Sequence, residues 1–198
     1  MHDSTVVVIG GTGFIGRHLV ARLEAAGCHV RVPTRNLAQG QALLPLPHVE
    51  VVEANVHDAL TLAKLIDGAD AVINLVGILH DGRGIPYGPG FAQNHVALPQ
   101  QIVSTCERLG VRRLLQMSAL GADPAGPSMY QRSKGDGEAA VARSSLDWTI
   151  FRPSVVFGPD DQFINLFARL QRYAPFMPLA CAHARFQLLD PRFNQRLL

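Results

Sequence analysis

Short apolar runs alternate with amphipathic stretches along most of the chain. Apolar residues recur at every fourth position at Ile15, Leu19 and Leu23, which predicts one face of a helix. Runs rich in Val, Ile and Leu predict buried strands over residues 5–9, 29–32, 49–54, 71–76, 113–117 and 148–151. Strands that alternate with helices at this spacing form a parallel sheet covered on both faces. The predicted fold class is therefore α/β, a doubly wound parallel sheet.

Polar and breaking residues between these strands set the expected helix boundaries. Gly27 ends the first helix, and Asp58 caps a helix that ends near Ile66. Another helix runs to about residue 109, with Pro99 either kinking it or marking its true first turn. Further helices are expected over residues 37–44 and 129–142.

Residues 80–90 hold four glycines and two prolines, so they are expected to form a loop. The loop follows the fourth strand and so lies at the carboxyl edge of the sheet, where ligands bind in such folds. Tyr87 or His95 could touch a substrate there. A loop this rich in glycine can equally be simply mobile, and neither residue is assigned a role.

Composition narrows the classes of function. With 198 residues, 47% of them hydrophobic and 17% charged, the chain fits one globular domain of ordinary size. A formal net charge of +2 gives no strong steering field, and no basic patch with interleaved aromatics precedes residue 160, so no nucleic-acid partner is expected. The start carries no signal-peptide pattern, and no apolar run reaches membrane-spanning length, which predicts a cytoplasmic protein.

Cysteine usage agrees with a reducing compartment. Cys28, Cys106 and Cys181 are widely spaced and odd in number, and the chain has no Cys-x-x-Cys and no His-x-x-x-His. Neither a disulfide framework nor a metal site is therefore expected.

A glycine-rich stretch joins the first strand to the first helix. Gly10, Gly13 and Gly16 form G-x-x-G-x-x-G, and Gly11 with the latter two forms G-x-G-x-x-G. Such glycines give a tight turn, close approach of backbone to a pyrophosphate, and tight packing of helix on strand, while the helix N-terminus attracts the phosphates. The other phosphate loop is excluded, because Arg17-His18 stands where Lys-Ser/Thr would be needed. The glycines could instead serve only a tight turn, but the strand before them and the amphipathic helix after them favour dinucleotide binding.

The end of the second strand bears on which dinucleotide binds. An NAD site usually places a carboxylate there to hold the ribose 2′-hydroxyl, but this chain has Thr34, Arg35 and Asn36. Arg35 is placed to meet a 2′-phosphate, with Arg17 assisting; the alternative is that Arg35 is a solvated loop residue. The pattern favours NADP(H) over NAD.

Tyr130 and Lys134 are one helical turn apart and so can face the same target. A free tyrosine has a pKa of about 10, so it needs a neighbouring cation to act as a base at neutral pH. The spacing alone leaves two possibilities open: an acid/base with its helper, or two surface residues that happen to be close.

The order of the motifs adds a family resemblance. "GGTGFIG", "NLVG", "MSALG", "YQRSK" and "FRPSVVFGP" follow successive strands in this order. The series resembles the extended and atypical short-chain dehydrogenase/reductases, which include epimerases and dehydratases with a Rossmann fold. Within them it is most similar to the group that contains the nucleotide-binding accessory subunit of respiratory complex I, over nearly all of residues 5–180.

The resemblance implies a role for each matching position. Ser118 would hydrogen-bond the substrate, Tyr130 would be the general acid/base, and Lys134 would lower its pKa and hold the nicotinamide ribose. Asn94 matches an asparagine that holds a proton-relay water in many relatives. The implied cofactor site comprises Gly10, Gly11, Thr12, Gly13, Phe14, Ile15, Gly16, Arg35, Asn55, Val56, Val76, Gly77, Lys134, Pro153, Ser154 and Val155.

The end of the chain departs from the family pattern. Fewer than fifty residues follow Pro153, where extended members build a substrate lobe. We therefore expect a nucleotide-binding domain over residues 1–160 and the remnant of a reduced or missing lobe over residues 161–198. A truncated form, an altered reading frame and a naturally minimal member are all compatible with this ending.

The tail from Asn165 carries five arginines against one aspartate, a balance of +4, with five aromatic residues interleaved. It is either a surface for a partner, an anionic membrane or an acidic substrate, or the lobe remnant, which is the favoured interpretation. Exposed apolar surface there would favour a homo-oligomer.

Three functions remain open from the sequence. The first is an NADP(H)-dependent oxidoreductase or epimerase/dehydratase that acts on an unidentified small molecule. The second is a non-catalytic accessory protein that docks on a respiratory complex at the inner face of a membrane. The third is a sensor of the NADP(H) redox state.

Overall fold

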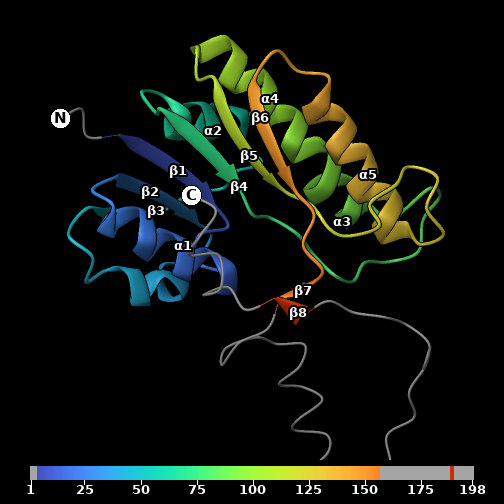
Figure 1. Cartoon of the computed structure of the whole chain (residues 1–198), viewed down its shortest axis with the longest axis horizontal. Coiled ribbons are helices and arrows are strands. Elements are labelled where there is room, and N and C mark those ends of the chain that lie inside the picture. The colour runs from blue at the N-terminus through green and yellow to red at the C-terminus, as the bar shows by residue number, and fades with distance from the viewer. Residues whose placement is uncertain (1–3, 157–187, 190–198) are drawn as a thin grey trace, which may run out of the picture. The chain divides into compact units, whose positions relative to one another are not determined.

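The computed structural model describes residues 4–156 and 188–189 of the chain. Its main feature is a parallel sheet with the strand order β3-β2-β1-β4-β5-β6 (Figure 1). The strands are β1 Thr5–Ile9, β2 His29–Thr34, β3 Val49–Glu53, β4 Ala71–Asn74, β5 Arg113–Met117 and β6 Asp147–Phe151. The chain order reverses between β1 and β4, which is where ligands bind in doubly wound folds. The predicted fold class is confirmed.

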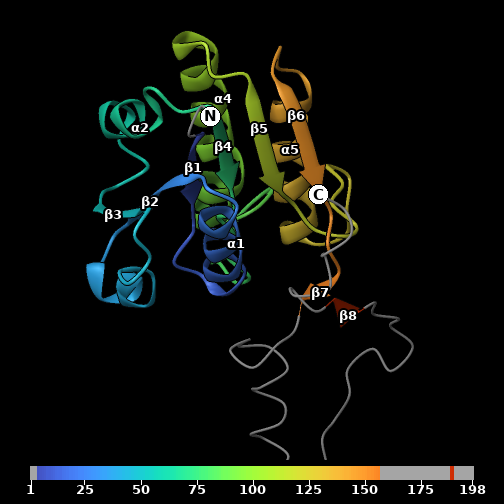
Figure 2. The ribbon, with the colours of Figure 1, turned by 60° about the vertical axis from the view of Figure 1, so that its left-hand side comes forward.

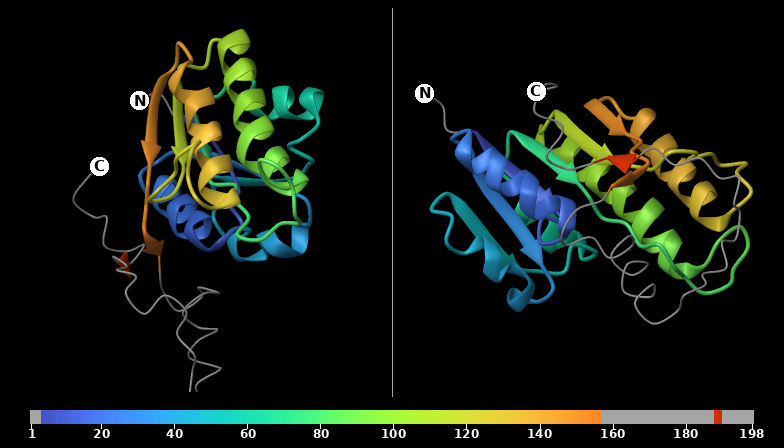
Figure 3. Two further views of the ribbon diagram at one scale, coloured as in Figure 1. Left: turned by 90° about the vertical axis from the view of Figure 1, so that its right-hand side faces the viewer. Right: turned by 60° about the horizontal axis from the view of Figure 1, so that its bottom comes forward.

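Helices cover both faces of this sheet (Figures 2 and 3). They are α1 Phe14–Ala25, the 3₁₀ helix η1 Leu37–Leu43, α2 Ala59–Ile66, α3 Pro89–Phe91, the π-helical turn η2 Ala92–Ala97, α4 Leu98–Leu109 and α5 Met129–Ala142. Successive β1 residues point to opposite faces, so Val7 packs with α2 and α4 residues while Val8 packs with Val20 of α1. The sheet is therefore buried on both sides.

Several helix boundaries agree with the sequence. Asp58 caps α2, because its carboxylate accepts the N–H of Thr61 at 2.8 Å. Helix α5 has the predicted bounds, with Ser128 and Gln131 forming a capping box at its start. Helical backbone is continuous over residues 89–109, and Pro99 lies in the first turn of α4. Pro99 therefore lies ten residues inside the continuous helical segment, two residues after the end of the π-helical η2.

Strand β4 ends at Asn74, two residues before the predicted end at Val76. The Asn74 side chain explains this, because its Oδ1 accepts the N–H of Val76 at 3.1 Å and its Nδ2 donates to Gln116 at 2.9 Å. The carboxamide takes a backbone donor that would otherwise continue the ladder. The chain leaves the sheet there and forms the β4 loop, residues 75–88.

Two glycines let α5 pack unusually close to its neighbours. A Cβ at Gly137 would overlap the carbonyl oxygen of His95 in η2, and one at Gly135 would overlap the backbone of Asp123 and Pro124. Glycine inside a helix costs about 1 kcal/mol relative to alanine, so this close approach is the physical reason for both residues.

The sheet belongs to a compact unit that ends at Arg152, and a second unit begins at Pro153. In the second unit, the backbones of β7 Val155–Val156 and β8 Leu188–Leu189 pair in parallel. The predicted boundary after residue 160 and Cys181 lie outside the described residues, and so does the basic aromatic tail except for the backbone of residues 188–189. Among the helices that the structure describes, none is both long and apolar enough to cross a membrane.

We expect Gly137→Ala to destabilise the protein by about 2 kcal/mol, because the added methyl group has no room beside His95. Helix propensity alone predicts the opposite sign, so the experiment separates the two effects. Urea denaturation measures the free energy of unfolding. Gly82→Ala is the matched control, since a Cβ there meets nothing within 4 Å. A Gly137→Ala variant as stable as the parent would contradict the packing argument.

Candidate functional site

The glycine loop after β1 forms a cradle at the start of α1. Gly10 has φ +84°, a conformation that favours glycine, and its carbonyl accepts the N–H of Gly13 at 3.1 Å. A Cβ at Gly16 would lie 2.6 Å from the Cα of Gly11, and one at Gly11 would lie 2.8 Å from a methyl of Val32. Gly13 is exposed, and at the start of α1 no side chain of the described residues caps the helix. The loop therefore offers free N–H groups that fit a pyrophosphate.

Several other residues of the predicted cofactor site fall into three groups. Thr12, Phe14 and Ile15 are half-buried beside the cradle. Val56 turns its side chain into the core, whereas Asn55 beside it lines a cavity. Pro153, Ser154 and Val155 belong to the second unit.

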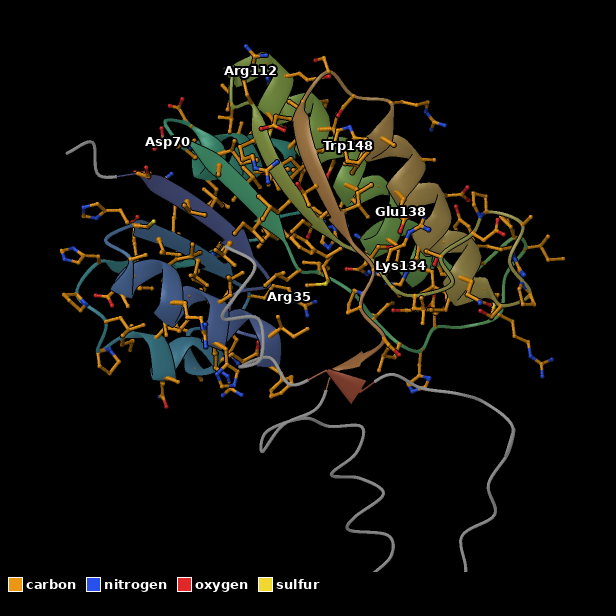
Figure 4. All side chains as sticks on the ribbon, in the orientation of Figure 1. Arg35, Asp70, Arg112, Lys134, Glu138 and Trp148 are labelled. Atoms are coloured by element: carbon orange, nitrogen blue, oxygen red, sulfur yellow. The ribbon has the colours of Figure 1, made fainter. Side chains whose placement is uncertain are left out.

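The cavity has a volume of about 570 Å³ and lies at the carboxyl ends of β2 and β3. Its lining is mostly polar, from Arg35, Glu53, Ala54, Asn55, His57, Gln93 and Asn94. The Arg35 side chain is exposed, and Figure 4 shows it separated from Lys134 along the sheet edge. Burial and the positive charge of Arg35 lower the pKa of His57. The cavity thus combines a cation with amide groups, which suits a phosphorylated nucleoside.

Asn94, for which the family resemblance implied that it holds a proton-relay water, lines this cavity. Its Nδ2 donates to the carbonyl of Gly90 at 2.9 Å. The residue that contacts Tyr130 is the next one, His95, whose ring lies 5.5 Å from the tyrosine ring in an edge-to-face arrangement.

Ser118 follows β5 and is 5% exposed. Its N–H donates to the carbonyl of Phe151 at 2.7 Å, but its Oγ has no hydrogen-bond partner among the described residues. A buried hydroxyl left unsatisfied costs about 1–3 kcal/mol. Such a group in a native fold calls for an explanation, and a ligand oxygen is one.

Lys134 is nearly buried, at 5% exposure, with its Nζ directed at the ends of β4 and β5. The ammonium donates to the carbonyls of Met117 at 3.3 Å and Val76 at 3.5 Å. Burial lowers the pKa of Lys134 to about 8, against the opposing charge of Glu138. A Cβ at Gly77 would lie 3.1 Å from Nζ, so glycine there makes room for the ammonium.

Tyr130 does not show the lowered pKa that the resemblance implied. Burial raises the pKa of its phenol, and the Lys134 ammonium is bound to backbone carbonyls instead. In the free protein, therefore, Tyr130 is fully protonated at neutral pH. This state suits a proton donor rather than a base.

Sequence reasoning did not identify Glu138, although its i+4 spacing from Lys134 was a usable signal. Glu138 is buried and forms an ion pair with Arg152, with Nε 2.9 Å from Oε1 (Figure 4 shows Glu138 beside Lys134 on α5). The pair places a carboxylate one turn from the buried ammonium.

The β4 loop is anchored to α5, which the glycine content did not indicate. The Tyr87 hydroxyl donates to Asp136 at 2.9 Å, and Arg132 donates to the carbonyl of Pro86 at 2.8 Å. Asp81 accepts the N–H of Phe91 at 2.6 Å. The loop is thus tied at several points along its length. Among the described residues, no cluster of His, Cys, Asp and Glu could hold a metal ion.

Comparison with known proteins agrees with this geometry. A family model described as NAD(P)H-binding matches residues 10–165. The chain is 31% identical over 176 residues to the mitochondrial NADH dehydrogenase [ubiquinone] 1 alpha subcomplex subunit 9 of Arabidopsis thaliana, covering 87% of this chain and 43% of that protein. It is 30% identical over 185 residues to a ceramide reductase of Caulobacter vibrioides, covering 93% of this chain and 56% of that protein. The chain thus spans about half the length of these relatives.

A solved structure shares the fold. The UDP-glucuronic acid 4-epimerase of Bacillus cereus, in complex with UDP-glucuronic acid and NAD, matches with a TM-score of 0.77 at 19% identity, over 95% of this chain and 69% of that one. The resemblance inferred from the order of the motifs is confirmed.

The depressed pKa of Lys134 predicts a stability effect with a defined sign. The unfolded lysine, with a pKa near 10.5, holds its proton more tightly than the folded one, at about 8. The contribution of Lys134 to the free energy of unfolding is therefore lowest below pH 8 and rises between pH 8 and 10.5. Lys134→Met removes the penalty, so we expect it to stabilise the protein at pH 7 by about 2 kcal/mol, a gain that shrinks as the pH rises to 10.5.

Denaturation at several pH values measures the difference between parent and variant. Lys64→Met, at the exposed second lysine of the chain, is the control and should show no such trend. A pH-independent effect of Lys134→Met would contradict the burial argument.

Proposed function

The chain belongs to the NAD(P)H-binding family, and from this premise we propose that it is an NADP(H)-dependent oxidoreductase or epimerase/dehydratase of the short-chain dehydrogenase/reductase type. Its substrate is a small molecule with a carbonyl or hydroxyl group. The observation that carries the proposal is the buried hydroxyl of Ser118, which has no hydrogen-bond partner among the described residues. The carbonyl of the preceding residue, Met117, accepts from the ammonium of Lys134, so the unused hydroxyl and the ammonium lie at the same strand end.

The residues present fit the dinucleotide in two halves. The glycine cradle would hold the pyrophosphate, and the cavity with Arg35 and Asn55 would hold the adenosine half. Val76, Gly77 and Lys134 would meet the nicotinamide ribose. The bound cofactor supplies or accepts a hydride.

Each catalytic side chain then has a stated task. Ser118 donates its unused hydrogen bond to the substrate oxygen and so orients it. Tyr130 gives its phenolic proton to that oxygen during reduction, and the protonated state found in the free protein agrees with this direction. Lys134 holds positive charge near the oxyanion that forms on Tyr130, which lowers the cost of losing the proton.

NADP(H) is the favoured dinucleotide because of the charge at the end of β2. Arg35 is exposed there and makes no hydrogen bond or ion pair within the described part of the chain, so its guanidinium is available to a 2′-phosphate. Glu53 does line the same cavity, but it comes from the end of β3.

A second candidate is a non-catalytic nucleotide-binding subunit of a respiratory complex. The likeness to NADH dehydrogenase subunits favours it, whereas the likeness to a protein named ceramide reductase favours an enzyme. The accessory protein would bind NADPH without turnover and dock peripherally on a membrane-associated partner.

We expect Arg35→Asp to weaken NADPH binding by about tenfold and to leave NADH affinity within about twofold, since only NADPH carries the 2′-phosphate. Titration of nucleotide fluorescence measures both affinities. Arg143→Asp makes the same charge change at an exposed site at the end of α5 and is the control. An unchanged ratio of affinities would remove Arg35 from cofactor selection.

We expect Tyr130→Phe to keep NADPH affinity within about threefold and to lower NADPH oxidation by at least about a hundredfold, because general acid catalysis contributes that much. An aromatic α-diketone serves as the probe substrate. Ser118→Ala should likewise lower the rate, while Ser104→Ala, at an exposed serine of α4, should not. Retained turnover in Tyr130→Phe would exclude it as the acid. Tight binding by the parent without any turnover would support the accessory protein instead.

A further inference from the structure

His95 is 2% exposed, and both of its ring nitrogens are hydrogen-bonded. The N–H of Ile78 in the β4 loop donates to Nε2 at 3.1 Å, and Nδ1 lies 2.8 Å from the Oγ of Ser133 on α5. Because Nε2 accepts a backbone N–H, the proton of the neutral ring resides on Nδ1, which donates to Ser133. Ser133 in turn donates to the carbonyl of Tyr130 at 3.0 Å. The hydrogen bonds therefore run from the β4 loop through His95 into the first turn of α5.

The same imidazole ring also packs against two aromatic side chains, one of which is Tyr130. It stacks on Phe91, with ring centroids 5.1 Å apart, and meets the ring of Tyr130 edge to face at 5.5 Å. A Cβ at Gly77 would lie 3.1 Å from the Nζ of Lys134 and 3.8 Å from Nε2 of His95, so these two nitrogens approach the same point. One side chain thus borders Tyr130, Ser133 and Lys134.

The charges around the ring keep it neutral. Burial, and then the ammonium of Lys134, lower the pKa of His95 to about 3, against the opposing charge of Asp81. A protonated ring would also lose its acceptor for the Ile78 N–H and would place a second cation beside Lys134. A fixed neutral acceptor is therefore the state that this packing maintains, in contrast to a proton relay.

We propose that His95 is a positioning residue that holds the β4 loop at Val76 to Ile78 against the face of α5 that carries Tyr130 and Lys134. This segment is bound at both ends, since Val76 accepts from Lys134 and Ile78 donates to His95. We call this arrangement of His95, Lys134 and residues 76–78 the clamp. It lies at the nicotinamide end of the proposed site. It does not include Arg35 or Asn55, which line the adenosine cavity. The inference rests on the proposed function for its effect on cofactor binding, but the clamp itself is a property of the free protein.

The test compares two ligands in three variants. NADPH spans both halves of the site, whereas 2′,5′-ADP fills only the adenosine half. His95→Phe keeps an aromatic ring but removes both hydrogen bonds, and His95→Gln keeps one acceptor and one donor. His80→Phe, at an exposed histidine of the β4 loop, is the control.

We expect His95→Phe to weaken NADPH binding by about tenfold and to change 2′,5′-ADP affinity by no more than about twofold. His95→Gln should restore NADPH affinity to within about threefold of the parent, and His80→Phe should alter neither ligand. Equal weakening of both ligands, or of neither, would overturn the positioning role, because a merely structural residue would not distinguish the two halves.

Amide hydrogen exchange in the free protein tests, independently of the cofactor, whether His95 holds the β4 loop at Ile78. The Ile78 amide should lose at least about tenfold of its protection in His95→Phe and keep it in His95→Gln. Unchanged protection in His95→Phe would refute the clamp. A parent chain that binds neither ligand would refute the proposed function and leave the exchange result to decide the clamp.

Discussion

The groups around the candidate site are arranged about one nearly buried cation, Lys134. Removing an ammonium group from water is costly unless it gains hydrogen bonds and opposite charge. Lys134 gains the carbonyls of Met117 and Val76, which the ends of β5 and β4 present at the sheet edge. Glu138 adds a carboxylate one turn away, and Arg152 balances it in turn. The neighbouring imidazole of His95 stays neutral, so the ammonium meets no second cation.

Placing that ammonium requires backbones to approach closely, and glycines make the approach possible. Gly77 leaves space for Nζ, and Gly137 lets α5 lie against the carbonyl of His95. Helix α5 consequently pairs a strong capping box with glycines that lower its own helix propensity. Its stability must then come from packing against η2 and α4. A helix that carries reactive side chains at fixed positions is thereby bound tightly to the sheet edge that it serves.

The carboxyl edge of the sheet separates into two regions with different chemistry. The cavity at β2 and β3 is polar and open, with an exposed arginine suited to recognising phosphate. The region at β4, β5 and α5 is drier, and burial there raises the pKa of Tyr130 and lowers those of Lys134 and His95. Low polarity strengthens each charge interaction during proton transfer, whereas recognition of a charged nucleotide needs only accessible donors. The division agrees with a family whose model is described as NAD(P)H-binding.

The sequence by itself determined the sheet, the glycine loop and the bounds of α5, because each depends on local periodicity, capping and backbone freedom. The i+4 spacing of Tyr130 and Lys134 likewise placed both residues on one helix. Only the tertiary structure decided where their side chains point, since the ammonium's partners are carbonyls 17 and 58 residues away in sequence. It also placed His95 against Tyr130 and Asn94 in the cavity at β2 and β3, because the packing of η2 on α5 selects which residue faces that helix.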